Sequence, residues 1–244
     1  MHWSKPEKMP CLNKSMVHVW CGNLDVLFQT VADIQRVLSE DEHKRANRFR
    51  FEKDHNRFVV GRAVLRHLLG HYVGQNPKDL MFVYGPHGKP ALNDVFKPIT
   101  FNISHSHGMG LWAFGLGKPI GVYVEWVHRK ADVKKLGKRF FSQREWADLC
   151  TLSNDALLAG FFQCWTQKEA FVKALGDGLS FSLKAFDVTV TGPAALHRLE
   201  GVENPDWVLH LLNPAPAFVG ALATQGAVQV HCFQADGAHF GNRP

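Results

Sequence analysis

Hydrophobic and polar positions alternate with two different periods along the chain, which predicts a mixture of strands and helices. A period of two predicts strands, because successive strand side chains point to opposite faces. Apolar residues three and four positions apart predict amphipathic helices. The predicted strands are residues 17–24, 101–104, 110–115, 120–126, 207–212, 218–224 and 228–233. The predicted helices are residues 25–38, 57–74, 131–138, 142–152 and 155–175.

Capping and turn residues divide this pattern into segments. Ser39 followed by Glu42 fits a capping box that starts a further helix in a stretch dense in charge. A Gly-Pro-His-Gly sequence after Tyr84 is a turn signal. Glycine and proline residues cluster just before residue 120. We therefore expect two halves, 1–117 and 118–244, each of which mixes helices with a sheet.

Composition bounds the class of protein. The chain has 244 residues, of which 45% are hydrophobic and 20% charged, so it can bury a substantial core. A net charge of +6 favours anionic ligands, which include nucleotides, nucleic acid and acidic proteins. The alternative is a generic basic surface with no particular ligand.

Several motif classes are absent from the sequence. The five cysteines show no C-x-x-C or paired spacing, which predicts reduced thiols in a cytoplasmic protein without a zinc ribbon. No signal-peptide core and no run of about 18 apolar residues occurs, so we expect no membrane span. Neither a dinucleotide-binding or Walker motif nor the nucleophile elbow of hydrolases is present.

Two acids lie in strongly apolar surroundings. Glu125 interrupts the predicted strand 120–126, and Glu169 lies beside Trp165 on a predicted helix. An ionised carboxylate is expensive among apolar side chains unless something compensates it, so the pair suggests a shared cation and a metal-assisted enzyme. The alternatives are a salt-bridged Glu125 and a solvated Glu169–Lys173 pair with i, i+4 spacing.

Six segments in a fixed order resemble the successive motifs of the Sfp-type 4′-phosphopantetheinyl transferases. The resemblance extends over about residues 15–230 and rests on the order of the motifs, because no single motif is decisive. The segments are GRAVLRHLLG (61–70), GKPAL (88–92), FNISHSHG (101–108), IGVYVEW (120–126), FFSQREW (140–146) and WTQKEAFVKALGDGLS (165–180).

The resemblance implies an α+β fold of two similar α/β halves related by a pseudo-twofold axis, with the active site in the cleft between them. It implies a Mg²⁺-dependent monomeric enzyme that moves the 4′-phosphopantetheine arm of coenzyme A onto a serine of an acyl or peptidyl carrier protein. The other product is 3′,5′-ADP. Carrier proteins are typically acidic, which suits the positive net charge.

The resemblance also assigns the catalytic side. It implies that Glu125 and Glu169 bind Mg²⁺, that Glu169 is the candidate base, and that Trp165, Lys168 and Lys173 lie at the active site.

One position departs from the family, which usually has G-[VI]-D-[VI]-E where this chain has Tyr123 before Glu125. A neutral phenol is a poor metal ligand, so we expect weaker metal binding. The alternative is a family member that binds coenzyme A but has impaired turnover.

The coenzyme A contacts implied by the resemblance lie in the first half. They are Arg45 and Arg57 for the 3′-phosphate, Lys89 and Pro90 for the adenine end, and Ser104 and His105 for phosphate oxygens. The basic stretch between residues 44 and 57 is alternatively a mixed charged helix surface or a nucleic-acid-binding module. The stretch lacks a run of aromatic platforms and any nucleic-acid-binding motif, so we expect no nucleic-acid partner.

Overall fold

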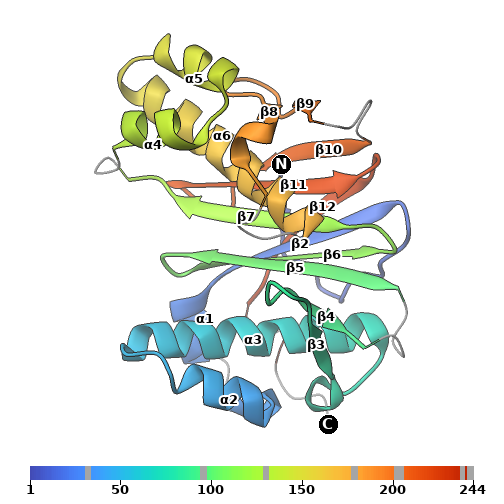
Figure 1. The fold of residues 1–244 in the computed structure, drawn as a ribbon. Coiled ribbons are helices and arrows are strands. Elements are labelled where there is room, and N and C mark those ends of the chain that lie inside the picture. The colour runs from blue at the N-terminus through green and yellow to red at the C-terminus, as the bar shows by residue number, and fades with distance from the viewer. Residues whose placement is uncertain are drawn as a thin grey trace.

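Two long helices lie on opposite outer sides of the molecule, with the strands between them (Figure 1). They are α3 (Glu52–Val73) and α6 (Asn154–Leu175), each of 22 residues. The computed structural model describes residues 1–30, 34–93, 98–128, 132–176, 181–200, 206–236 and 240.

The elements follow the predicted mixture of strands and helices. The first half contains β1 (Trp3–Ser4), β2 (Met16–Asn23), α1 (Leu24–Thr30), a 3-10 helix (Ile34–Val37), α2 (Glu40–Ala46), α3, a 3-10 helix (Pro77–Asp79), β3 (Phe82–Tyr84), β4 (Pro90–Leu92), β5 (Ile99–Ser106) and β6 (Met109–Leu116). The second half contains β7 (Ile120–Trp126), α4 (Val133–Phe140), α5 (Gln143–Cys150), α6, a 3-10 helix (Leu183–Ala185), β8 (Phe186–Val188), β9 (Leu196–Leu199), β10 (Trp207–Leu212), β11 (Phe218–Gln225) and β12 (Gln229–Gln234).

The two halves repeat one topology. In the first half a strand and a long helix precede an antiparallel hairpin, and the neighbours in the sheet are β2, β6 and β5. The second half repeats this arrangement with α6 and the sheet order β7, β11, β10. In both sheets the last strand of the unit pairs antiparallel with the first strand. The repeat confirms the prediction of an α+β fold with two similar halves.

The last strand of the chain belongs to the first sheet. β12 pairs parallel with β2, and β1 pairs parallel with β12, so the sheet order is β1-β12-β2-β6-β5. The structural units are therefore not simple consecutive stretches of sequence, although the division at residue 117 describes most of each sheet.

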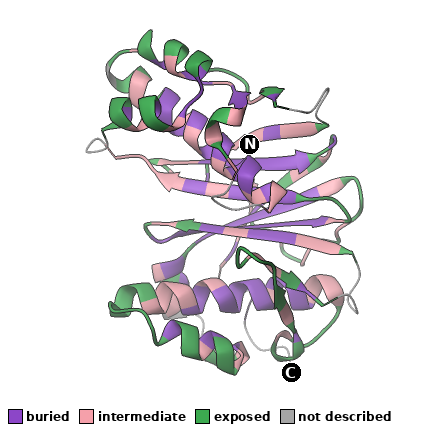
Figure 2. Ribbon diagram, in the orientation of Figure 1, coloured by how far each residue is buried: buried purple, intermediate pink, exposed green. Residues whose placement is uncertain are grey.

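The central strands are buried along most of their length (Figure 2), and successive side chains enter cores on opposite faces. On β2, Trp20 packs into the core beneath α3, whereas Val19 packs into a second core between the two sheets. On β11, Leu222 enters the core between the sheets, and Ala223 enters a third core beneath α6. The molecule thus has four layers in the order helix, sheet, sheet, helix.

Polar side chains connect the facing edges of the two sheets. Asn102 Oδ1, Ser104 Oγ and Ser106 Oγ accept hydrogen bonds from the backbone N–H groups of Val122, Val124 and Trp126, at 2.9, 3.2 and 3.2 Å. The spacing of two on both strands means that alternate side chains of β5 replace a second backbone ladder along β7. This β5–β7 seam satisfies edge groups that would otherwise be unpaired.

A glycine allows α6 to lie directly on β7. A Cβ atom added at Gly121 would overlap the carbonyl oxygen of Ala170 and the backbone nitrogen of Ala174. Only glycine permits this approach of helix backbone to strand. As a result, the last turns of α6 lie against the strand that carries Glu125.

The structure differs from the predicted elements mainly at boundaries. The predicted helix 25–38 is divided into α1 and a 3-10 helix, and residues 31–33 lie outside the described residues. Ser39 and Glu42 form the predicted capping box of α2. The short strands β1, β3, β4, β8 and β9 were not predicted. No helix in the described part of the chain is apolar enough over 18 residues to cross a membrane.

Candidate active site

A cavity of about 470 Å³ lies where the two halves meet. We call this cavity the central pocket. Its walls come from α2, α3, the β3–β4 turn and β5 on one side, and from β7 and the end of α6 on the other. The candidate residues that line it are Arg45, Arg57, Lys89, Pro90, Ser104, His105, Tyr123 and Lys173. A second pocket of about 410 Å³ shares Lys173 with the first and includes Glu169.

The Glu125 carboxylate is held from three sides. Ser106 donates from Oγ to Oε1 at 2.5 Å, and the backbone N–H of Trp126 donates to the same oxygen at 3.0 Å. Tyr123 donates from its hydroxyl group to Oε2 at 3.0 Å. Ser106 was not identified from the sequence. The N-x-S-x-S alternation from residue 102 to residue 106 is the signal that could have found it.

Tyr123 connects the strand to the helix. Its hydroxyl group donates to Glu125 and interacts with the Trp165 side chain, and Lys173 Nζ lies 5.7 Å from its ring centroid. Burial raises the pKa of Tyr123 above its usual range, and the charge of Glu125 raises this pKa further. The phenol is therefore neutral at pH 7. Trp165 itself packs against Phe140 and stacks on Phe161.

Glu169 lies close enough to Glu125 for their charges to interact. Among the described residues, none donates a hydrogen bond to its carboxylate or lies within ion-pair distance. Burial raises the pKa of Glu169, the charge of Lys173 opposes this shift, and the charge of Glu125 adds to it. A carboxylate in these surroundings gains stability from a cation.

Two carboxylates make a partial fit to Mg²⁺. No group of three or more histidine, cysteine or acidic side chains suited to a metal ion occurs in the described part of the chain. Tyr123 occupies the strand position from which a further ligand could come. Because Mg²⁺ usually keeps several waters and substrate phosphates, Glu125 and the unpaired Glu169 suffice as its protein ligands.

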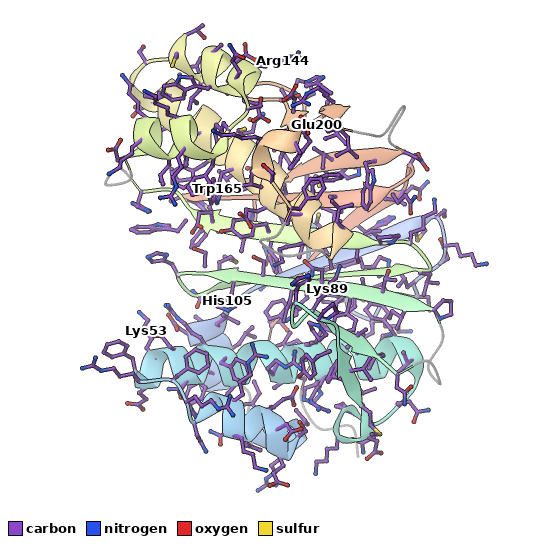
Figure 3. All side chains as sticks on the ribbon, in the orientation of Figure 1. Lys53, Lys89, His105, Arg144, Trp165 and Glu200 are labelled. Atoms are coloured by element: carbon purple, nitrogen blue, oxygen red, sulfur yellow. The ribbon has the colours of Figure 1, made fainter. Side chains whose placement is uncertain are left out.

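Both lysines at the boundary of the halves donate to backbone carbonyls. Lys173 Nζ donates to the Ile103 carbonyl at 2.5 Å, and Lys89 Nζ donates to the Lys173 carbonyl at 2.6 Å. Figure 3 shows the side chains of Lys89 and His105 at the level where the two halves meet. Lys89 therefore caps the negative end of α6, which favours a cation there. Burial lowers the pKa of Lys173 to about 8; the charge of Glu169 opposes this shift, and that of Lys89 adds to it.

Lys168 lies in the interior of the second half and lines neither pocket. Its side chain is fully buried, and Nζ lies 2.7 Å from Glu145 Oε1. It also donates to the carbonyls of Leu183 and Phe186 at 2.7 Å each. These three acceptors hold the amine away from both pockets, and the active-site role that the resemblance implies stays a prediction. From these contacts we propose a structural role for Lys168.

The basic side chains of the central pocket differ in what remains available for a ligand. Arg57 donates from Nε and Nη2 to the two carboxylate oxygens of Asp25 at 2.8 and 2.7 Å. Arg45 is exposed, and its guanidinium carbon lies 5.6 Å from the Phe58 ring centroid. Arg45 is thus open to a ligand, whereas most of the Arg57 fork is already engaged.

His105 and Ser104 have different roles at the pocket wall. Desolvation lowers the pKa of His105, and the charges of Lys173 and Arg57 lower this pKa further. The imidazole is therefore neutral at pH 7, so its contribution to anion binding is a hydrogen bond. The Ser104 hydroxyl accepts from the backbone of β7 in the seam, and its own proton remains available as a donor.

Arg62 also lines the central pocket and was not selected from the sequence. Its position after Gly61 on α3 gives a pattern no different from that of other helix arginines. Its burial is unusual, since only 4% of the residue is exposed.

Comparisons with known proteins identify the family. Residues 119–223 match the profile of the 4'-phosphopantetheinyl transferase superfamily, and residues 27–113 match that of a 4'-phosphopantetheinyl transferase N-terminal region. A solved structure, the Thermotoga maritima holo-[acyl-carrier-protein] synthase, aligns with a TM-score of 0.36 and 22% identity over 44% of this chain and 62% of its own.

Relatives with established names agree with the profiles. The chain is 38% identical to the 4'-phosphopantetheinyl transferase HetI of Nostoc sp., over 91% of this chain and 92% of the relative. It is 30% identical to psf-1 of Bacillus pumilus over 80% and 82% of the two chains. It is 32% identical to Sfp of Bacillus subtilis over 62% and 66%. The chain therefore belongs to the 4′-phosphopantetheinyl transferase family.

Proposed function

We propose that the protein transfers the 4′-phosphopantetheine arm of coenzyme A to a serine hydroxyl of an acyl or peptidyl carrier protein and releases 3′,5′-ADP. The observation that carries this proposal is the central pocket, which has basic side chains at its α3 end and the Glu125–Glu169 pair beside its α6 end. We also expect the enzyme to act as a monomer in the cytoplasm.

Coenzyme A would lie along the pocket with its nucleotide end toward α2 and α3. Arg45 provides an exposed guanidinium group for the 3′-phosphate. Arg57 contributes the N–H donors that are not bonded to Asp25. Pro90 shapes the wall beside the adenine end. Lys89 contributes to this wall indirectly: its amine donates to the Lys173 carbonyl and so fixes the end of α6 beside the adenine end.

The reaction needs charge neutralisation and a base more than it needs covalent chemistry. The serine oxygen forms a bond to the phosphorus that bears the pantetheine arm, and the bond from this phosphorus to the bridging oxygen of the pyrophosphate breaks. Lys173 places positive charge beside the transferred group. Glu169 accepts the serine proton, and its raised pKa strengthens it as a base.

Mg²⁺ would be held by Glu125 and Glu169, and when bound it would neutralise charge on the pyrophosphate. The side chains of Ser106 and Tyr123 orient Glu125 for this role.

A second candidate function is coenzyme A binding with little turnover. It is favoured by the Tyr123 hydroxyl group, which occupies one oxygen of Glu125 and replaces a carboxylate of the family.

The deciding measurement is a mass spectrum of an apo carrier protein after incubation with this protein, coenzyme A and Mg²⁺. Transfer adds the mass of one phosphopantetheine arm to the carrier. An unchanged carrier, together with coenzyme A binding in a separate titration, would select the second function. An unchanged carrier without such binding would reject both functions.

A further inference from the structure

Arg62 is a buried arginine whose guanidinium group is fixed on most of its perimeter. Nε donates to Glu42 Oε1 at 2.7 Å, and Nη2 donates to the Tyr84 hydroxyl at 3.0 Å. The guanidinium carbon lies 4.7 Å from the Phe82 ring centroid. A donor held in this way loses little conformational entropy when it binds a ligand.

The remaining nitrogen of this group is Nη1. None of the described residues accepts a hydrogen bond from Arg62 Nη1. The residue lines the central pocket beside Gly61, where a Cβ atom would meet nothing within 4 Å. Open space therefore lies next to an oriented donor in the pocket wall.

The charges around Arg62 leave a positive surplus. Glu42 is buried between Arg62 and Arg66, with N···O distances of 2.7 and 2.6 Å. Burial acts to raise the pKa of Glu42, but these two arginines and the backbone N–H of Ser39 hold this pKa below its usual range. One carboxylate thus faces two guanidinium groups. Arg66 donates from Nη1 to the carbonyls of Pro77 and Leu80 and does not line the central pocket. The excess positive charge of the two arginines over Glu42 is therefore presented to the pocket by Arg62.

An oriented guanidinium nitrogen with surplus charge suits a phosphate monoester, which carries more charge than a diester. We propose that Arg62 is a substrate-binding residue that donates from Nη1 to the 3′-phosphate of coenzyme A. This inference rests on the proposed function. It makes Arg62 a determinant of selectivity for coenzyme A over dephospho-coenzyme A, which lacks only that phosphate.

The test is calorimetric titration of coenzyme A and dephospho-coenzyme A into the wild-type protein and two matched variants. Arg62→Met leaves Glu42 paired with Arg66, and Arg66→Met leaves it paired with Arg62, so each variant retains one balanced buried pair. We expect Arg62→Met to weaken coenzyme A binding by about tenfold or more, as for a charged hydrogen bond. Dephospho-coenzyme A binding should change by less than about threefold on the same scale. Arg66→Met should leave the ratio of the two affinities unchanged.

Equal weakening of both ligands by Arg62→Met would overturn the proposal, because it would assign Arg62 to another part of the nucleotide or to the fold alone. An altered ratio in Arg66→Met would do the same. If Arg62→Met fails to fold, Arg62→Lys keeps a buried charge beside Glu42 without Nη1, and the same selective loss is expected. Coenzyme A binding and carrier modification by the wild-type protein test the proposed function separately.

Discussion

The hydroxyl group of Tyr123 donates a hydrogen bond to Oε2 of Glu125 across 3.0 Å on one face of β7. A neutral phenol therefore stands where a second carboxylate of the strand would face the metal site. The interaction orients Glu125 and at the same time reduces the negative charge available to a cation.

Tyr123→Asp should lower the Mg²⁺ concentration needed for half-maximal carrier modification. A further charged oxygen ligand contributes about 1–2 kcal/mol, by analogy with charged hydrogen-bond partners, which corresponds to about 5–30-fold in metal affinity. Tyr123→Phe, which removes the hydroxyl group and keeps the ring, is the control and should not lower the midpoint. An unchanged or higher Mg²⁺ midpoint in Tyr123→Asp would reject this interpretation of the position.

Glu169→Gln should abolish most transfer without unfolding the protein. The substitution keeps the shape of the side chain but removes the base and a metal-binding charge, and loss of general base catalysis alone costs about 10²–10⁴-fold in rate. Single-turnover carrier modification measures the rate, and thermal unfolding checks the fold. A variant that retains more than about a tenth of the wild-type rate would show that Glu169 is not the base.

Lys168→Met should reduce stability and leave the chemistry of the folded protein nearly unchanged. The substitution leaves Glu145 buried without its cation, and breaking a buried ion pair costs about 3–5 kcal/mol. Adding Glu145→Gln should restore part of the free energy of unfolding, because it removes the unpaired charge. Urea unfolding and single-turnover rates separate the two effects. Wild-type stability combined with lost turnover would instead support a catalytic Lys168.

The pH dependence of kcat/KM for coenzyme A should show an alkaline limb caused by Lys173. Because burial lowers the pKa of Lys173 to about 8, its positive charge is complete well below this pH and is lost as the pH rises through it. Activity should therefore decline above about pH 8, since kcat/KM reports the ionisation of the free enzyme. Lys173→Arg should move the decline to higher pH. An alkaline limb that is identical in both proteins would have to come from another group.

The sequence predicted the fold well where one local pattern decides the structure. Residues 17–24 and 120–126 were correctly predicted as strands, because their successive side chains enter cores on opposite faces. Ser39 and Glu42 correctly predicted the start of α2, because a capping box is satisfied within four residues. The short strands β3 and β4 were missed, since three residues are too few for a period to be visible.

The candidate site was predicted less completely, because side-chain partners come from distant segments. The W-x-x-K-E-x-x-x-K pattern placed Lys168 and Lys173 on one helix but did not reveal that Lys168 meets Glu145 in the interior. Likewise, the G-K-P turn indicated Lys89, yet its acceptors lie at the far end of α6. Arg62 could not be singled out because its burial depends on α2 and β3 folding over α3.

The pairing of β12 with β2 has a consequence for how the protein is made. Val17 is synthesised long before its neighbour in the sheet, Val230, because the whole second sheet lies between them in the sequence. The edge of β2 stays unpaired throughout that interval, and exposed edges of this kind favour association with other chains. The first sheet thus closes only after all strands of the second sheet have been translated. Chain termination before residue 229 would leave a folding intermediate with an open edge.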